Sequence, residues 1–167
     1  FNVGYLSTLK NKEFFEKPLS RIKADGFTDL RIYEPFTNNL YKNPELQYEL
    51  LKSVTDKGFN VLLCLSDYPH DEAPANAENS DDDDIRKTIK FSNRFAPTDI
   101  SAYTAFLNQF VEGLKENDIL EKMSFEIGNE PDAKKYFWST PADFIKIAKA
   151  SKVVLLRYNR PIYCCGF

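Results

Sequence analysis

Short apolar runs alternate with helical patterns along the whole chain, and this alternation constrains the fold more than any other feature. The runs with strand character are residues 1–6, 28–33, 59–65, 123–128 and 161–165. Their apolar character is nearly continuous, as in the strands of a parallel sheet that is covered on both faces. The alternation therefore predicts βαβ units around one parallel sheet, in a single domain that spans residues 1–167.

Helix start and stop signals separate these runs. The first helical pattern ends near Gly26, and the second begins after Asn43, a favourable N-cap that proline follows. An apolar stripe at helical spacing predicts a third helix over residues 98–115. The fourth begins after Thr140, where Asp143 lies three residues past the cap, as in a capping box. The sequence thus predicts four helices between five strands.

Two architectures fit this pattern. One is the first five strands and four helices of a TIM (β/α)₈ barrel, whose usual length is about 250 residues. The other is an open parallel α/β sheet, which the length of 167 residues favours by itself. No glycine-rich phosphate loop follows the first run, which counts against the nucleotide-binding form of the open sheet.

Composition excludes several classes of function. The net charge of −3 gives no electrostatic reason to expect a nucleic acid or an anionic membrane as partner. The acidic block at residues 71–84 ends in four aspartates and lacks the spaced ligands of a calcium loop, so we expect a solvated loop. The cysteines form no metal-ligand spacing, and each lies in an apolar run where a thiol behaves as a small buried hydrophobe: Cys64, Cys164 and Cys165. We therefore expect no metal site.

Polar and aromatic residues follow the strand-like runs, at the carboxyl ends where α/β folds bind ligands. They are Tyr5 and Ser7 at the end of the first run, Arg31, Tyr33 and Glu34 at the end of the second, Ser66, Asp67, Tyr68 and His70 at the end of the third, and Asn129, Glu130 and Asp132 at the end of the fourth. His70 is the only histidine, so a pair of catalytic histidines is excluded. It is as consistent with a surface position as with a substrate contact.

The most specific motif is Phe-Glu-Ile-Gly-Asn-Glu-Pro-Asp at residues 125–132. Strand alternation predicts Glu126 and Glu130 on one side and Asn129 on the other. The strand must end at Pro131, which cannot donate to a ladder. A carboxyl group beside an amide suits protonation of a glycosidic oxygen while the amide binds a sugar hydroxyl. The alternative is a strand end followed by a turn.

In this context the motif resembles clan A of the retaining glycoside hydrolases, in which Gly-Asn-Glu-Pro ends the fourth strand of a barrel. The Glu-Ile-Gly-Asn-Glu form is similar to the xylosidase, arabinofuranosidase and heparanase-like branches. The segment Tyr-Phe-Trp at residues 136–138 and the Thr-Pro-x-Asp-Phe helix opening are similar to β-xylosidase-like members. The resemblance follows the strand order of the whole chain but is specific only around residues 125–144.

The resemblance implies that Glu130 is the catalytic acid/base and that Asn129 binds the sugar 2-hydroxyl. Arg31 matches in position an arginine that orients the nucleophile in many clan members, and a structural salt bridge with an acid such as Glu34 is the alternative. Trp138 and Tyr68 are expected to stack on sugar rings, with packing as the competing explanation. Asp67 and His70 complete the expected substrate-binding set. No cofactor is implied, and a location outside the cytoplasm follows from the substrates of the family.

The clan places its nucleophile at the end of a seventh strand, and no residue of this chain corresponds to it. We therefore expect self-association or a missing C-terminal barrel half to complete the sheet. Two other functions remain open. One is a non-catalytic carbohydrate-binding or interaction module on a partial barrel. The other is an unrelated open α/β domain in which Asn-Glu-Pro is only a turn.

Overall fold

Five parallel strands form one sheet, and they lie in the order in which they follow one another in the chain. The computed structural model describes residues 2–5, 12–33, 43–66, 68, 95–132, 137 and 139–164. The strands are β1 (Asn2–Tyr5), β2 (Asp29–Tyr33), β3 (Asn60–Leu65), β4 (Met123–Ile127) and β5 (Ile162–Cys164). All five runs that the sequence predicted as strands are therefore strands, and no end differs by more than one residue.

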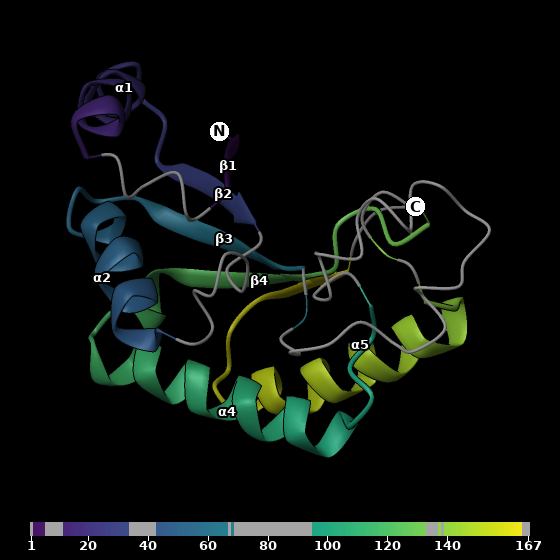
Figure 1. Ribbon diagram of the computed structural model, residues 1–167. Helices are drawn as coiled ribbons and strands as arrows, with labels where there is room; N and C mark the ends of the chain where they lie inside the picture. Colours follow the sequence, from purple (N-terminus) through teal and green to yellow (C-terminus); the bar gives the residue numbers. More distant parts are fainter. Residues whose placement is uncertain are drawn as a thin grey trace.

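The sequential strand order distinguishes the two predicted architectures. Doubly wound open sheets reverse their strand order and place later strands on both sides of the first. A (β/α)₈ barrel instead adds each strand beside the previous one. The described part of the chain is a twisted parallel α/β sheet with the strand order of such a barrel (Figure 1). Right-handed crossovers then place every connecting helix on the same face of the sheet.

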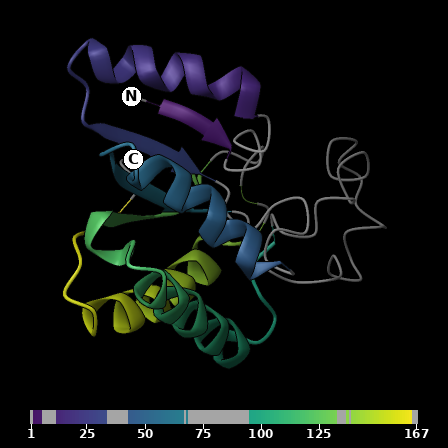
Figure 2. The ribbon, with the colours of Figure 1, turned by 90° about the vertical axis from the view of Figure 1, so that its left-hand side faces the viewer.

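The helices that connect the strands are α1 (Lys12–Ala24), α2 (Pro44–Thr55), α4 (Ile100–Glu116) and α5 (Pro141–Leu156), with a short 3₁₀ turn η4 (Leu120–Lys122) before β4. Figures 1 and 2 show them arranged along the sheet from α1 at one end to α4 and α5, which lie side by side at the other. None of the helices in the described ranges is long and apolar enough to cross a membrane.

The helix caps follow the sequence signals closely. The side chain of Asn43 accepts a hydrogen bond from the backbone N–H of Leu46, and α2 begins at Pro44 as predicted. Thr140 and Asp143 form the predicted capping box of α5. The third predicted helix begins two residues later than expected, because Asp99 takes the N-cap position and accepts from the N–H groups of Ser101 and Ala102.

Alternate residues of the central strands build the core between sheet and helices. Along β4 the outward residues Met123, Phe125 and Ile127 are buried, whereas Ser124 and Glu126 between them are partly exposed. The equivalent buried positions on β2 and β3 are Leu30, Ile32, Val61, Leu63 and Leu65. We call this the helix-covered face, and we call the opposite face, with Arg31 and Glu126, the inner face. The core thus lies on one side of the sheet and leaves polar side chains on the other.

The strand β5 corrects one expectation. Cys64 on the central strand β3 is buried as predicted, but Cys164 is exposed because it lies on β5, at the edge of the described sheet, where β4 is its one neighbour among the described strands. Cys165 lies outside the described residues.

Candidate active site

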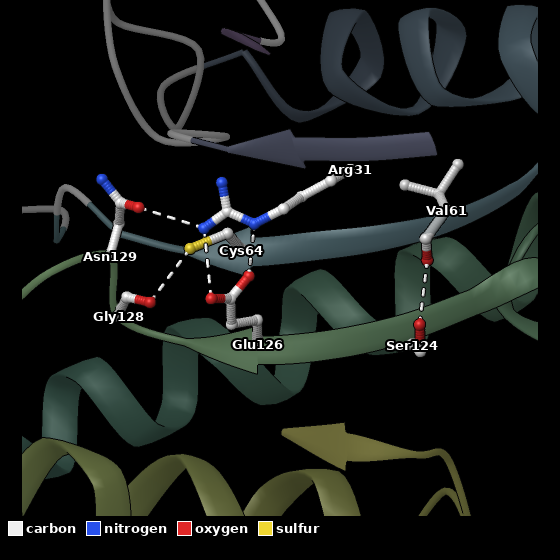
Figure 3. Close-up of polar contacts among 7 residues, drawn as sticks. All are labelled: Arg31, Val61, Cys64, Ser124, Glu126, Gly128 and Asn129. Carbon is white, nitrogen blue, oxygen red and sulfur yellow. Dashed lines mark hydrogen bonds and ion pairs between the residues drawn. The ribbon is translucent and has the colours of Figure 1, made fainter. Parts of the chain in front are cut away.

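The carboxyl end of β4 leaves the sheet through a sharp change of backbone direction. The strand ends at Ile127, and Gly128 follows with a φ of +78°. A β-carbon at Gly128 would lie 2.6 Å from Cε2 of Phe144, so both the backbone conformation and the space require glycine here. Hydrogen bonds hold this residue to β3, since its N–H donates to the carbonyl of Leu65 and its carbonyl accepts from the thiol of Cys64 (Figure 3).

This turn corrects the predicted orientation of Asn129. Strand alternation placed Asn129 on the side opposite Glu126, but both side chains contact the same guanidinium group (Figure 3). The positive φ of Gly128 breaks the alternation one residue after the strand ends. Asn129 therefore returns to the inner face of the sheet, where Arg31 lies.

Arg31 of β2 joins the two residues. Its Nε donates to Oε2 of Glu126 at 2.6 Å, and its Nη2 donates to Oε1 at 3.1 Å. The same Nη2 also donates to Oδ1 of Asn129 at 3.0 Å. We call Arg31, Glu126 and Asn129 the arginine cluster. The expected alternative of a salt bridge for Arg31 is thus observed, but its partner is Glu126, and Glu34 lies outside the described residues.

The electrostatics of the cluster follow from partial burial. The side chains of Arg31 and Glu126 are 25% and 14% exposed, so solvent screens their attraction less than at an open surface. The hydrogen bonds that Arg31 donates to Glu126 raise the pKa of Arg31 above its ordinary value, although desolvation acts in the opposite direction. The guanidinium also lies 5.4 Å from the ring centre of Tyr33, within range of a cation–π contact. The cluster is therefore a fixed, charged group on the inner face.

Glu130 lies directly after this cluster in an unusual conformation. Its side chain is exposed and its φ is +44°, in the left-handed region. The other described non-glycine residues with positive φ are Asp118 and Asn159, which follow helix ends and belong to residue types that tolerate this region. Glutamate has no such tolerance, and strained backbone of this kind concentrates at functional sites. The conformation therefore distinguishes Glu130 from every other glutamate in the described ranges.

The other predicted site residues have different outcomes. Tyr68 is 2% exposed, and its ring packs edge-on against those of Tyr103 and Phe137. These contacts give it a packing role, and its contact with a sugar stays a prediction. Asp67, His70 and Trp138 lie outside the described residues, as does the acidic block at 71–84. Across the described ranges, no three His, Cys, Asp or Glu side chains gather in a way that could hold a metal ion.

Sequence reasoning did not select Glu126 as a site residue. The sequence did contain a sign of its role, because Glu126 is a charged residue within an apolar strand, and a partly buried charge needs a partner. The partner lies 95 residues away in the sequence, so no local pattern could identify it.

A cavity of about 650 Å³ lies on the helix-covered face, away from the arginine cluster. Apolar residues of α5 and β5 line it, among them Ile145, Leu156 and Ile162, and Lys149, Lys152 and Arg160 add positive charge. This groove lies beside the edge strand, where the described residues place no further helix.

Comparison with known proteins gives a likeness of fold. No protein-family model matches the chain, and no curated protein sequence matches it. Among solved structures, the GH39 enzyme from Xanthomonas axonopodis pv. citri matches with a TM-score of 0.66 and 14% sequence identity, over 96% of this chain. The fold resembles that of a glycoside hydrolase. This chain spans 33% of the length of that solved chain, and at this identity the likeness concerns the fold alone.

Proposed function

We propose that this chain supplies the acid/base part of a retaining glycoside hydrolase site in a TIM-barrel framework. The observation that carries the proposal is the left-handed conformation of Glu130 at the carboxyl end of β4, directly after an asparagine held by Arg31. The carboxyl ends of parallel strands are where barrel enzymes place their catalytic groups. The fold likeness to a GH39 enzyme supports the assignment to glycoside hydrolysis.

The proposed chemistry uses Glu130 twice. As an acid it donates a proton to the glycosidic oxygen while a second carboxylate attacks the anomeric carbon. As a carboxylate it then takes a proton from the water that hydrolyses the glycosyl intermediate, with retention of configuration. Asn129, next to it, binds the sugar 2-hydroxyl. Asp67, His70 and Trp138 complete the substrate contacts in this proposal, and no cofactor takes part.

The second carboxylate comes from outside the described residues in this proposal. We propose that a further barrel segment or a second copy of the chain supplies it. The apolar groove between α5 and β5 supports association of this kind, because large apolar side chains such as Ile145 and Leu156 are exposed there beside the edge strand. A location outside the cytoplasm accords with polysaccharide or oligosaccharide substrates.

The experiment is to replace Glu130 in the protein as its source produces it and to measure hydrolysis of a panel of aryl glycosides and polysaccharides. Glu130→Gln should lower turnover by roughly 10²–10⁴-fold. Asp132→Asn is the matched control. Asp132 is another exposed acid two residues away, and its replacement should leave turnover unchanged. Unchanged turnover in Glu130→Gln would remove the proposal. Sugar binding without hydrolysis, unaffected by Glu130→Gln, would favour a non-catalytic carbohydrate-binding module.

A further inference from the structure

The contact between Arg31 and Asn129 determines which end of the asparagine amide is bound to Arg31 and which end points away from it. A guanidinium carries only hydrogen-bond donors, so it can contact the Oδ1 of an amide but not its NH₂ group. The 3.0 Å contact from Nη2 therefore fixes Oδ1 toward Arg31 and turns Nδ2 away from it. Within the part of the chain that the structure describes, Nδ2 donates no hydrogen bond. Asn129 is thereby presented as a donor.

Glu126 in turn fixes the guanidinium. Two nearly parallel hydrogen bonds, from Nε and Nη2 to the two carboxylate oxygens, hold the plane of the group in one orientation. Because Nη2 carries two hydrogens, one can bond to Glu126 and the other to Asn129. A lysine at position 31 would keep the charge but lose this fork.

The backbone makes this arrangement possible. Glu126 and Asn129 reach the same guanidinium only because Gly128 takes a left-handed conformation between them. Three segments thus converge on one amide: the strand β2 through Arg31, the strand β4 through Glu126, and the turn at Gly128 (Figure 3). The amide they orient belongs to the residue that immediately precedes Glu130.

We propose that Arg31 and Glu126 are positioning residues that hold the amide of Asn129 with its NH₂ group directed at a sugar hydroxyl beside Glu130. The inference rests on the proposed function for its ligand, a glycoside with a free 2-hydroxyl. It assigns to Arg31 a role through Asn129, and the orientation of the nucleophile that the family resemblance implied for Arg31 stays a separate prediction.

The first test measures the order of the Asn129 amide itself, by ¹⁵N relaxation of its side chain in this chain without ligand. In the wild type the order parameter should be near that of rigid backbone, about 0.85, and in Arg31→Lys and Glu126→Gln it should fall below about 0.6. Arg160→Lys is the matched control, because Arg160 makes a similar set of contacts with Glu121 and the carbonyl of Met123 at the opposite end of β4. An amide that stays equally ordered in both cluster variants would overturn the proposal.

The second test measures kcat/KM on an aryl glycoside and on its 2-deoxy counterpart. Arg31→Lys and Glu126→Gln should each lower the value by roughly 10–100-fold on the first substrate and by less than about 3-fold on the second. Adding Asn129→Ala to Arg31→Lys should cause no further loss. Equal losses on both substrates would overturn the role through Asn129. If the protein hydrolyses no glycoside, the proposed function fails, and the amide measurement still decides the positioning role.

Discussion

Alternate residues of the same strands form the two faces of the sheet, yet one face is packed with apolar side chains and the other holds the charged cluster. On β4, Phe125 is fully buried under the helices, and its neighbour Glu126 points to the inner face and binds Arg31. The helix-covered face gains its stability from packed apolar area, whereas the inner face holds charged groups in fixed geometry. The difference shows that one strand can carry both stability and chemistry, because successive side chains point to opposite faces.

The sharpest contrast between the faces should appear in adjacent residues of β4. Phe125→Ala should lower the free energy of unfolding by about 3–5 kcal/mol, because it leaves a cavity in the closed core. Ser124→Ala, on the inner face, should cost less than about 1 kcal/mol, since it removes only a 3.4 Å hydrogen bond to the carbonyl of Val61. Urea denaturation measures both values. Similar losses in the two variants would contradict the division between the faces.

Charge should be tolerated poorly in the buried core between the sheet and the helices, and Tyr103 of α4 tests this. Burial raises the pKa of Tyr103 to about 12, although its hydrogen bond with Ser151 opposes the shift. The unfolded chain therefore loses this proton first, so the stabilising contribution is complete below about pH 10 and is lost as the pH rises toward 12. By pH 12 the loss should reach roughly 2 kcal/mol.

Denaturation at several pH values compares the wild type with Tyr103→Phe. The variant should lose less stability between pH 10 and 12, whereas the contribution of Tyr158, whose pKa is also raised to about 12, remains in both proteins. Parallel pH profiles would show that Tyr103 is not held in its neutral form.

The boundary between the two faces lies at Gly128. Gly128→Ala should destabilise the protein by about 1–3 kcal/mol, because the new methyl group meets the ring of Phe144 in addition to the strain of a positive φ. Gly26→Ala separates the two effects, since Gly26 also has a positive φ but no atom within 4 Å of the added carbon. A thermal unfolding series gives the comparison, and equal costs at the two glycines would contradict the steric account.

The sequence predicted the helix-covered face better than the inner face, and the reason is physical. Caps such as Asn43 and the Thr140–Asp143 box are local, so their signals lie within a few residues. The strands were recognisable because their apolar runs are set by burial. The order of the strands was not, since spacing alone fits both a barrel and an open sheet.

The geometry of the candidate site depends on features that no local pattern encodes. The motif identified Glu130 as a candidate, but strand alternation could not predict its left-handed φ. The pairing of Arg31 with Glu126 arises from the strand register across three neighbouring strands. The return of Asn129 to the inner face depends on the positive φ of Gly128. The sequence does not predict this sign, because glycine adopts positive and negative φ about equally readily.

The most direct test of the central claim is how the activity lost in the Glu130→Gln variant depends on the leaving group of the substrate. Aryl glycosides from dinitrophenyl to unsubstituted phenyl would be compared by kcat/KM in the protein as its source produces it. If Glu130 is the acid, the loss should be small for dinitrophenol, which departs without a proton, and should grow steadily toward phenol. A loss of equal size across the whole series, or no loss for any member, would contradict the assignment of Glu130 as the acid/base.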